Sequence, residues 1–210
     1  MFKICRRFNL PRAPRAVAPL ARAVLGTVVL NCATLAPAQD TVQLRTNFYT
    51  ITGSTERALR RALNESRPWK NQDATDARTD WQVQWSYTYA PAGGGFRVRS
   101  VETKTTITYT LPRWTPDPDA PRELRAGWAK YLAALQTHEE GHARIARAAA
   151  AEIRQRVAGL KSGLDAGHLE KSVNEAAGKA LAGHRERDAQ YDKKTLHGAT
   201  QGAVFPDRPR

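Results

Sequence analysis

Alternation of apolar and polar residues is clearest between residues 81 and 89. The odd positions there carry aromatic or β-branched side chains, and the even positions carry Gln, Ser and Thr. A period of two is typical of a strand with one buried face, so 81–89 predicts a half-buried strand. A glycine-rich turn at 91–95 separates it from a second alternating stretch, 96–111, and the two predict an antiparallel hairpin. The stretch 41–51, rich in β-branched and aromatic residues, predicts one further strand.

Three stretches have the spacing of apolar residues that predicts helices. The first, about 55–65, follows Ser54, which we expect to cap it. The second begins near Glu123, and its apolar residues recur mostly at intervals of three, four or seven as far as Leu160. The third covers about 169–186. This pattern predicts the α+β class, with a small antiparallel sheet packed on the long helix and a second C-terminal helix behind it.

The long predicted helix contains His138-Glu139-Glu140-Gly141-His142, which fits the pattern H-E-x-x-H. Residues four apart lie on one face of a helix, so the two imidazoles can bind one zinc ion. Both histidines continue the apolar stripe, which places them on the buried face. Glu139 is then the candidate general base for a water on the metal. The pattern predicts zinc as the cofactor, His138 and His142 as ligands, and Glu139 as a catalytic residue.

A catalytic zinc ion needs a third protein ligand and one open position. The sequence favours His197, which lies in an irregular, glycine-flanked segment after the last predicted helix. Asp192 is an alternative, either as a metal ligand or as a partner that orients a histidine. Glu175 and His184, both on the last predicted helix, are further alternatives. Tyr191 is a candidate catalytic residue, as a donor to a developing oxyanion.

The N-terminus has the layout of a secretory signal peptide. Residues 1–22 carry six basic residues and no acid, an apolar run follows at 23–30, and Ala36-Pro37-Ala38 fits a cleavage site. The apolar run is shorter than the roughly 20 residues of a membrane span. We therefore expect a signal peptide at 1–38, one domain at 39–210 and no transmembrane span after cleavage. The predicted location is the periplasm or the outside of the cell.

Cysteine content and charge limit the partners of the mature chain. Cys5 and Cys32 both precede the predicted cleavage site, so the mature chain has no disulfide. A lipid anchor at Cys32 is the alternative to cleavage after Ala38, although Asn31 is not the small residue expected before a lipid-modified cysteine. The formal net charge of +13 falls by six with the signal peptide. No basic cluster interleaved with aromatic residues is present, so we expect no nucleic-acid partner.

The chain resembles a bacterial family of predicted secreted zinc-dependent proteases, built on a domain of unknown function. The similarity lies in the N-terminus, the segment 48–53, the aromatic strand 81–89, the H-E-x-x-H pentapeptide and the ending 191–202, with its pattern Tyr-Asp-x-x-Thr-x-His-Gly-x-x-Gln-Gly. It covers nearly all of residues 41–205. The resemblance implies a zincin-like fold and a metallopeptidase activity, and it favours His197 as a functional residue.

The residues and the resemblance together predict an exported zinc-dependent peptidase that acts on a peptide or protein substrate. Glu139 takes a proton from the attacking water in this interpretation. The outer strand of the hairpin, 103–111, is expected to hold an extended peptide by strand addition. Two alternatives stay open: a non-catalytic, envelope-associated zinc-binding module, and a zinc amidase that acts on cell-wall peptides. The sequence leaves the oligomeric state open.

Overall fold

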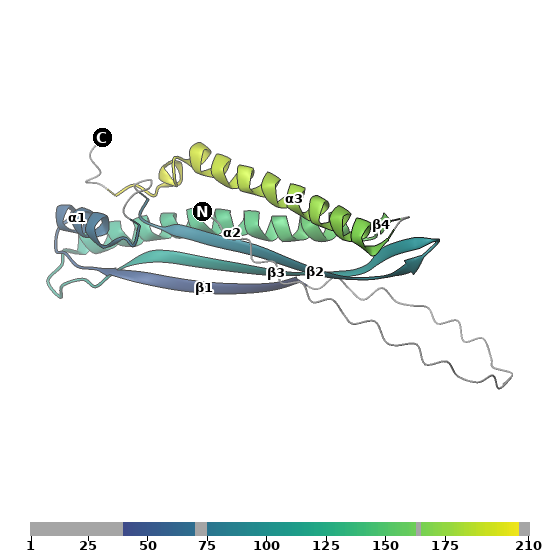
Figure 1. Cartoon of the computed structure of the whole chain (residues 1–210). Helices are drawn as coiled ribbons and strands as arrows, with labels where there is room; N and C mark the ends of the chain where they lie inside the picture. Colours follow the sequence, from purple (N-terminus) through teal and green to yellow (C-terminus); the bar gives the residue numbers. More distant parts are fainter. Residues whose placement is uncertain (1–39, 70–74, 163–164, 206–210) are drawn as a thin grey trace, which may run out of the picture.

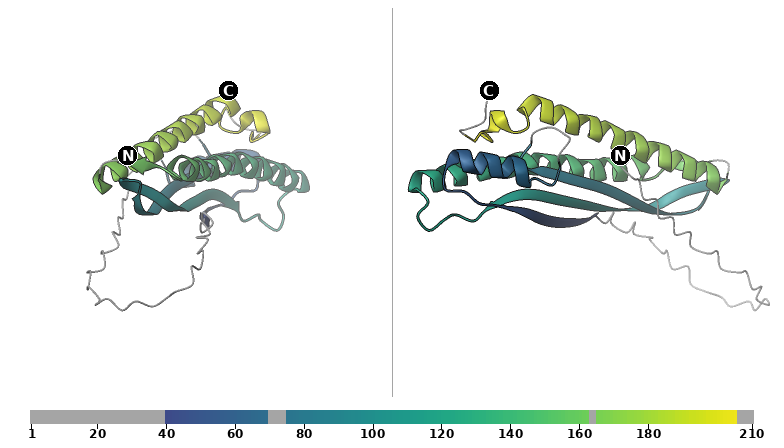
Figure 2. Two further views of the ribbon diagram at one scale, coloured as in Figure 1. Left: turned by 90° about the vertical axis from the view of Figure 1, so that its right-hand side faces the viewer. Right: turned by 60° about the vertical axis from the view of Figure 1, so that its left-hand side comes forward.

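The computed structural model describes residues 40–69, 75–162 and 165–205. Its elements are β1 (Asp40–Ile51), α1 (Glu56–Ser66), β2 (Arg78–Ala92), β3 (Gly95–Trp114), α2 (Arg122–Val157), β4 (Lys161–Ser162), α3 (Ala166–Thr195) and a short 3₁₀ helix, η1 (Ala199–Gln201). The predicted α+β class is confirmed, with three α-helices and a mixed sheet. The two long helices lie on one face of the sheet, and α2 lies between the sheet and α3 over much of its length (Figures 1 and 2).

The sheet has the order β1–β3–β2, with β4 added to β3. As expected, β2 pairs antiparallel with β3. Gly93 and Gly94 form the turn, and their φ angles of 60° and 82° explain why glycine occupies both positions. β1, however, runs parallel to β3, so the expectation of an antiparallel sheet is wrong. Parallel strands need a long crossover, and α1 with β2 supplies it.

Residues 103–111 lie in the middle of the sheet. β1 pairs with residues 103–114 on one side of β3, and β2 pairs with residues between 95 and 110 on the other. The expectation that 103–111 is an outer strand available for strand addition is therefore wrong, because both sides of this strand are already paired. Among the described strands, β1, β2 and the two-residue β4 occupy the outer positions.

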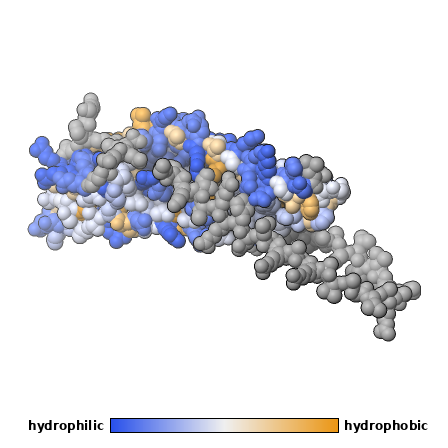
Figure 3. Space-filling model, viewed as in Figure 1, coloured by the Kyte–Doolittle hydropathy of each residue, from blue (hydrophilic) through white to orange (hydrophobic). Residues whose placement is uncertain are grey.

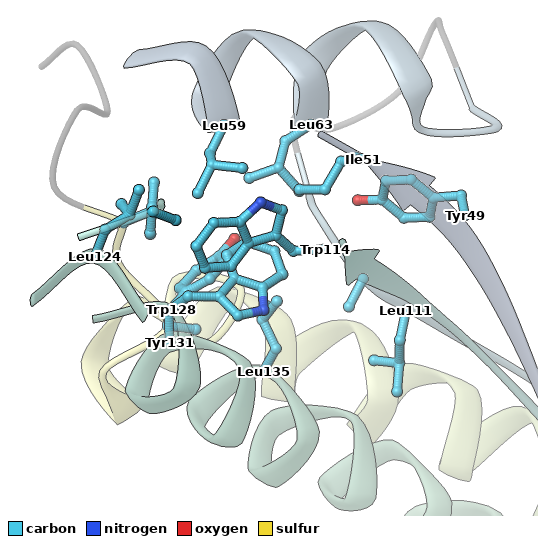
Figure 4. Packing of buried hydrophobic residues seen from close by; sticks show 14 residues of the cluster. Tyr49, Ile51, Leu59, Leu63, Leu111, Trp114, Leu124, Trp128, Tyr131 and Leu135 are labelled. Atoms are coloured by element: carbon cyan, nitrogen blue, oxygen red, sulfur yellow. The ribbon is translucent and has the colours of Figure 1, made fainter. Parts of the chain in front are cut away.

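Two apolar clusters lie at opposite ends of α2. The first joins α1, β1 and the first half of α2, and its rings include Trp114 and Trp128, whose centroids are 5.9 Å apart (Figure 4). The second joins the β2–β3 hairpin to the second half of α2 and to α3, around the fully buried Ile153 and Val173. Burial of apolar surface stabilises each end of α2. The pentapeptide 138–142 lies between the two clusters.

Two helix ends differ from the sequence predictions. Thr55, and not Ser54, caps α1, because the Thr55 side chain accepts a hydrogen bond from the Ala58 N–H. α3 continues to Thr195, well beyond the expected end near residue 186. Tyr191 and Asp192 therefore lie on a helix and not in an irregular segment.

The face shown in Figure 3 is mostly hydrophilic, with hydrophobic residues in small separate spots. Within the described ranges, each helix is too short or too polar to cross a membrane. The expected signal peptide at 1–38, with Cys32, lies outside the described residues.

Candidate metal centre

The middle of α2 places the pentapeptide 138–142 in the interior. His138, Glu139 and His142 are exposed by only 3%, 3% and 6%. Their helical spacing brings the two imidazole rings together, with centroids 4.9 Å apart and planes at 87°. Glu140 is partly exposed on the opposite side, as the apolar stripe predicts. Both histidines therefore point away from solvent toward the same region of the interior.

Asp192 on α3 joins the two histidines in a group of three ligand atoms. The two Nε2 atoms, of His138 and His142, are 3.3 Å apart, and Oδ1 of Asp192 lies 3.2 Å from the first and 3.1 Å from the second. Ligands about 2.0–2.1 Å from a tetrahedral zinc ion are roughly 3.3 Å from one another. The three atoms fit three corners of such a tetrahedron, so this group could hold a metal ion.

The other nitrogen of each imidazole is bonded to an acceptor from a different element. Nδ1 of His142 donates to Oδ1 of Asp188 at 2.8 Å, and Nδ1 of His138 donates to Oε1 of Gln201 at 3.0 Å. With its proton on Nδ1, each neutral ring presents the Nε2 lone pair toward Asp192. Acceptors of this kind typically orient metal-bound histidines. Three acceptor atoms then face one another, and a cation between them removes their repulsion.

Charge within the group shifts two pKa values of the metal-free protein. Burial lowers the pKa of His142, but hydrogen bonds and charges from Asp188 and Asp192 outweigh burial and raise this pKa from 6.5 to about 10. Burial raises the pKa of Asp192, yet its hydrogen bonds to His138 and His142 hold it well below the ordinary value of 3.8. At neutral pH a proton on His142 therefore supplies the positive charge, and a metal ion must displace it.

Glu139 lies against the start of β2. Its Oε2 atom accepts a hydrogen bond of 2.6 Å from the Thr79 hydroxyl. Burial raises the pKa of the Glu139 carboxyl, and this effect exceeds the lowering by Thr79 and by the charges of His142 and His138. A carboxyl whose pKa is raised toward neutrality is suited to accept and return a proton.

Tyr191 packs directly against the motif. Its ring stacks on that of His138, with centroids 5.0 Å apart and planes at 11°. Its hydroxyl donates to the His138 backbone oxygen at 3.2 Å and accepts from the Gln201 amide at 3.0 Å. A Cβ atom at position 141 would collide with this hydroxyl, which explains why Gly141 occurs within the motif. The structure thus gives Tyr191 contacts that position His138.

The segment after α3 closes around His138. The hydroxyl of Thr195 lies 3.4 Å from Nδ1 of His138, beside the Gln201 contact. Gly198 has a φ of 85°, and a Cβ there would come within 3.0 Å of the His138 ring. Only glycine fits both conditions. Thr195, Gly198 and Gln201 therefore hold the His138 ring in place.

The remaining ligand candidates lie outside the group of three. His197, the favoured third ligand, has its Nδ1 atom 3.5 Å from Oδ1 of Asp192. His184 is buried, but its Nε2 atom pairs with Glu152 at 2.8 Å. Glu175 is exposed on α3. The geometry thus brings Asp192 to the place for which His197 was favoured.

Sequence reasoning did not identify Asp188 and Thr79, which contact a candidate ligand and the candidate base. Asp188 accepts from His142 with one oxygen and from the Trp81 indole, at 3.1 Å, with the other. Thr79 bonds to Glu139. Both contacts join residues far apart in the sequence. The one local signal is that Asp188 and Asp192 are four residues apart, which places both on the same face of a helix.

A cavity of about 350 Å³ adjoins these residues. Its volume lies near the lower end of the range for small-molecule sites, about 300–1,000 Å³. Its walls come from the segment before β2, the start of β2, α2, the end of α3 and the segment after α3. The lining includes Trp69, Trp81, Leu135, His138, Glu139, His142, Arg185, Asp188, Asp192 and His197. The candidate base and the candidate ligands therefore share one accessible space.

The fold and the site define an α+β protein with a candidate metal centre between two long helices. Residues 46–198 match the model of a bacterial family of unknown function, DUF922, and the chain belongs to this family. The match includes the H-E-x-x-H pentapeptide, Asp192 and His197, and it gives the family without an activity. No curated protein and no solved structure matches the chain.

Proposed function

We propose that the chain is a zinc-dependent peptidase in which His138, His142 and Asp192 hold the metal ion. The observation that carries this proposal is the group of three acceptor atoms, 3.1, 3.2 and 3.3 Å apart, with both Nδ1 atoms bonded elsewhere. Two imidazoles and one carboxylate are a common ligand set of catalytic zinc. A zinc ion held by these three residues would be able to bind a water or a substrate oxygen as well.

Glu139 is the proposed general base. Bound zinc supplies positive charge that acidifies a water molecule and polarises a carbonyl group. Glu139 accepts a proton from the water as the water oxygen forms its bond to the peptide carbonyl carbon. The carboxyl then returns the proton to the amide nitrogen, whose bond to that carbon breaks, and an acid and an amine are released. Thr79 fixes one oxygen of Glu139 throughout, through its hydrogen bond of 2.6 Å.

The proposed substrate is an extended peptide that pairs with the outer edge of β2. Residues 75–81 line the cavity as one continuous segment and share it with His138 and Glu139. Among the described strands, β2 has a neighbour on one side only. Its other side can pair with a peptide backbone, which would place the peptide beside the catalytic residues. This site replaces the one expected at 103–111.

We also propose that the protein is exported and that residues 1–38 are removed. The support is the basic N-terminus, the short apolar run and the Ala-Pro-Ala site in the sequence. Expression in a bacterial host, followed by mass spectrometry of the processed protein, is expected to give Gln39 as the first residue. An intact N-terminus, or a lipid on Cys32, would contradict cleavage after Ala38.

A pair of matched substitutions tests the proposed reaction. In the zinc-loaded protein, Glu139→Gln is expected to lower the hydrolysis of denatured, fluorescently labelled casein by about 10²–10⁴-fold, because the proton acceptor is lost. Zinc content is expected to stay unchanged, since Glu139 is not a ligand. Glu140→Gln is the control, because Glu140 bonds to Tyr109 and Arg147 outside the cavity. Wild-type activity in Glu139→Gln would refute the proposed role.

A further inference from the structure

His197 follows α3 in a turn with left-handed backbone. The φ angles of Leu196, His197 and Gly198 are 50°, 51° and 85°. The His197 N–H donates to the Asp192 backbone oxygen at 3.0 Å, and the Gly198 N–H lies 3.4 Å from the Thr195 hydroxyl. Left-handed backbone is unfavourable for residues other than glycine, so these contacts hold the turn in place. They bring the His197 side chain back toward Asp192.

The His197 imidazole borders the metal centre from outside the ligand group. Its Nδ1 atom lies 3.5 Å from Oδ1 of Asp192, 36% of the side chain is exposed, and the residue lines the cavity. Among the described residues, one ligand atom each from His138, His142 and Asp192 lie within 4.8 Å of one another. His197 does not belong to this group. A fourth tetrahedral ligand would need to be roughly 3.3 Å from each of the other three. His197 therefore lies next to the group of candidate ligands and is not part of it.

Both indole N–H groups that line the cavity are already bonded. The Trp69 indole donates to the Thr75 backbone oxygen at 3.0 Å, and the Trp81 indole donates to Asp188 at 3.1 Å. Arg78 pairs with Asp80 at 2.8 Å, and Arg185 also has a partner. His197, 3.5 Å from Oδ1 of Asp192, is a cavity-lining imidazole that lies next to a candidate ligand and is partly exposed.

We propose that His197 is not a metal ligand but binds, through an imidazole N–H, an anionic oxygen held at the open metal position. The chemical class of ligand is a tetrahedral oxyanion, such as a phosphonate. In the proposed peptidase, the same contact stabilises the oxygen of the attacked carbonyl. The inference rests on the proposed metal centre. A neutral imidazole has one N–H to donate, so the contact requires no change in the charge of His197.

Cobalt-loaded protein provides the test, because the visible spectrum of Co(II) reports its ligands. His197→Gly deletes the side chain and suits the left-handed backbone, and His197→Ala is the second variant. In both variants we expect the wild-type Co(II) spectrum and one metal ion per chain. We expect the affinity for methylphosphonate to fall about 10–100-fold, as for a lost hydrogen bond to a charged group. Binding of acetohydroxamate, which chelates the metal through two oxygens, should not change. His168→Ala, at an exposed histidine of α3, is the control.

Two results would overturn the inference. Loss of cobalt or an altered spectrum in both variants would show that His197 is a ligand. Unchanged methylphosphonate affinity in both would show that it binds no oxyanion. None of these measurements requires peptide hydrolysis. A protein that gives the expected cobalt and phosphonate results but cleaves no peptide would therefore refute the proposed activity and leave the role of His197 intact.

Discussion

Two carboxylates that line the cavity, those of Asp76 and Asp192, have opposite kinds of neighbours. Asp76 is 3% exposed, and its Oδ2 atom is bonded by the Arg60 guanidinium and by the Tyr131 hydroxyl. Asp192 instead meets the Nε2 atoms of two histidines whose Nδ1 protons are bonded elsewhere. Two donors thus meet Oδ2 of Asp76, whereas Oδ1 of Asp192 meets two imidazole nitrogens that are acceptors when both histidines are neutral.

This difference separates a structural cluster from a ligand site. A guanidinium and a hydroxyl both donate to Oδ2 of Asp76, while its buried Oδ1 atom has no hydrogen-bond partner among the described residues. Burial together with the charge of Asp76 raises the pKa of Tyr131 well above its ordinary value, so the hydroxyl stays a donor. In the group at Asp192, neither His138 nor His142 donates to the carboxylate once both are neutral. The group needs a proton or a metal ion from outside. The balance of donors and acceptors, and not burial alone, therefore supports Asp192 as a candidate metal ligand.

Asp192→Asn should have the largest effect on metal binding. Loss of the carboxylate removes a ligand, so zinc affinity is expected to fall by more than the roughly 10–100-fold that removal of an outer partner costs. Competition with a chelating indicator measures this affinity. Glu175→Gln, on an exposed position of α3, should keep wild-type affinity. Equal affinities in Asp192→Asn and the wild type would refute the role of Asp192.

Asp76→Asn should change stability and not zinc content. The substitution leaves the buried Arg60 guanidinium without its counter-ion, so the free energy of unfolding is expected to fall by about 3–5 kcal/mol. Urea unfolding of the metal-free protein measures this difference. Tyr131→Phe removes one hydrogen bond to the carboxylate and should cost about 1.5–3 kcal/mol. If Asp76→Asn lost zinc and kept the wild-type free energy of unfolding, the structural role of Asp76 would be refuted.

Asp188→Asn should have a smaller effect than Asp192→Asn. Asp188 orients His142 through Nδ1 and is itself held by the Trp81 indole. Zinc affinity is expected to fall about 10–100-fold while the stoichiometry stays at one ion per chain. The same indicator assay at higher zinc concentration separates weakened binding from lost binding. If Asp188→Asn lost as much zinc affinity as Asp192→Asn, the proposal that Asp188 only orients His142 while Asp192 binds the metal would be refuted.

A change of pH should affect stability and zinc binding less than the substitutions do. The pKa of His142 is raised from 6.5 to about 10, so its charge stabilises the metal-free fold fully below pH 6.5, and this contribution is lost as the pH rises through 10. Asp192, whose pKa is lowered, contributes above its ordinary 3.8 and loses its effect as the pH falls below that value. Zinc binding should release about one proton near pH 7.

Calorimetry in buffers of different ionisation enthalpy counts that proton. The increase in Tm that zinc produces should also grow between pH 6 and 9, because fewer protons compete with the metal at higher pH. An increase in Tm that is independent of pH would contradict protonation of His142 in the metal-free protein.

The sequence was sufficient to place His138 and His142 on one buried helix face, because an interval of four residues fixes their relation. It was also sufficient for the hairpin, where alternation and a Gly-Gly turn are local signals. It did not give the parallel pairing of β1 with β3, because the side-chain pattern of a strand does not name its partner. Because β1 pairs with β3, both sides of β3 are occupied, and the peptide site expected at 103–111 cannot exist there.

The end of α3 shows a second limit. Beyond Leu181 the apolar stripe disappears, so the helix was expected to end near 186. In the structure the same face continues with polar residues that contact α2 and the candidate metal centre: His184, Asp188, Asp192 and Thr195. A polar stripe at helical spacing was the available signal. Hydrophobic periodicity could not detect it, because a helix face that holds a polar site contains few apolar residues.

An anomalous difference map at the zinc edge, from a crystal of the zinc-loaded protein, tests the central claim most directly. The expected result is one peak about 2.0–2.2 Å from Nε2 of His138, Nε2 of His142 and a carboxylate oxygen of Asp192, with the His197 ring outside this distance. Absence of a peak between the two histidines, or a peak with His197 in the place of Asp192, would contradict the account.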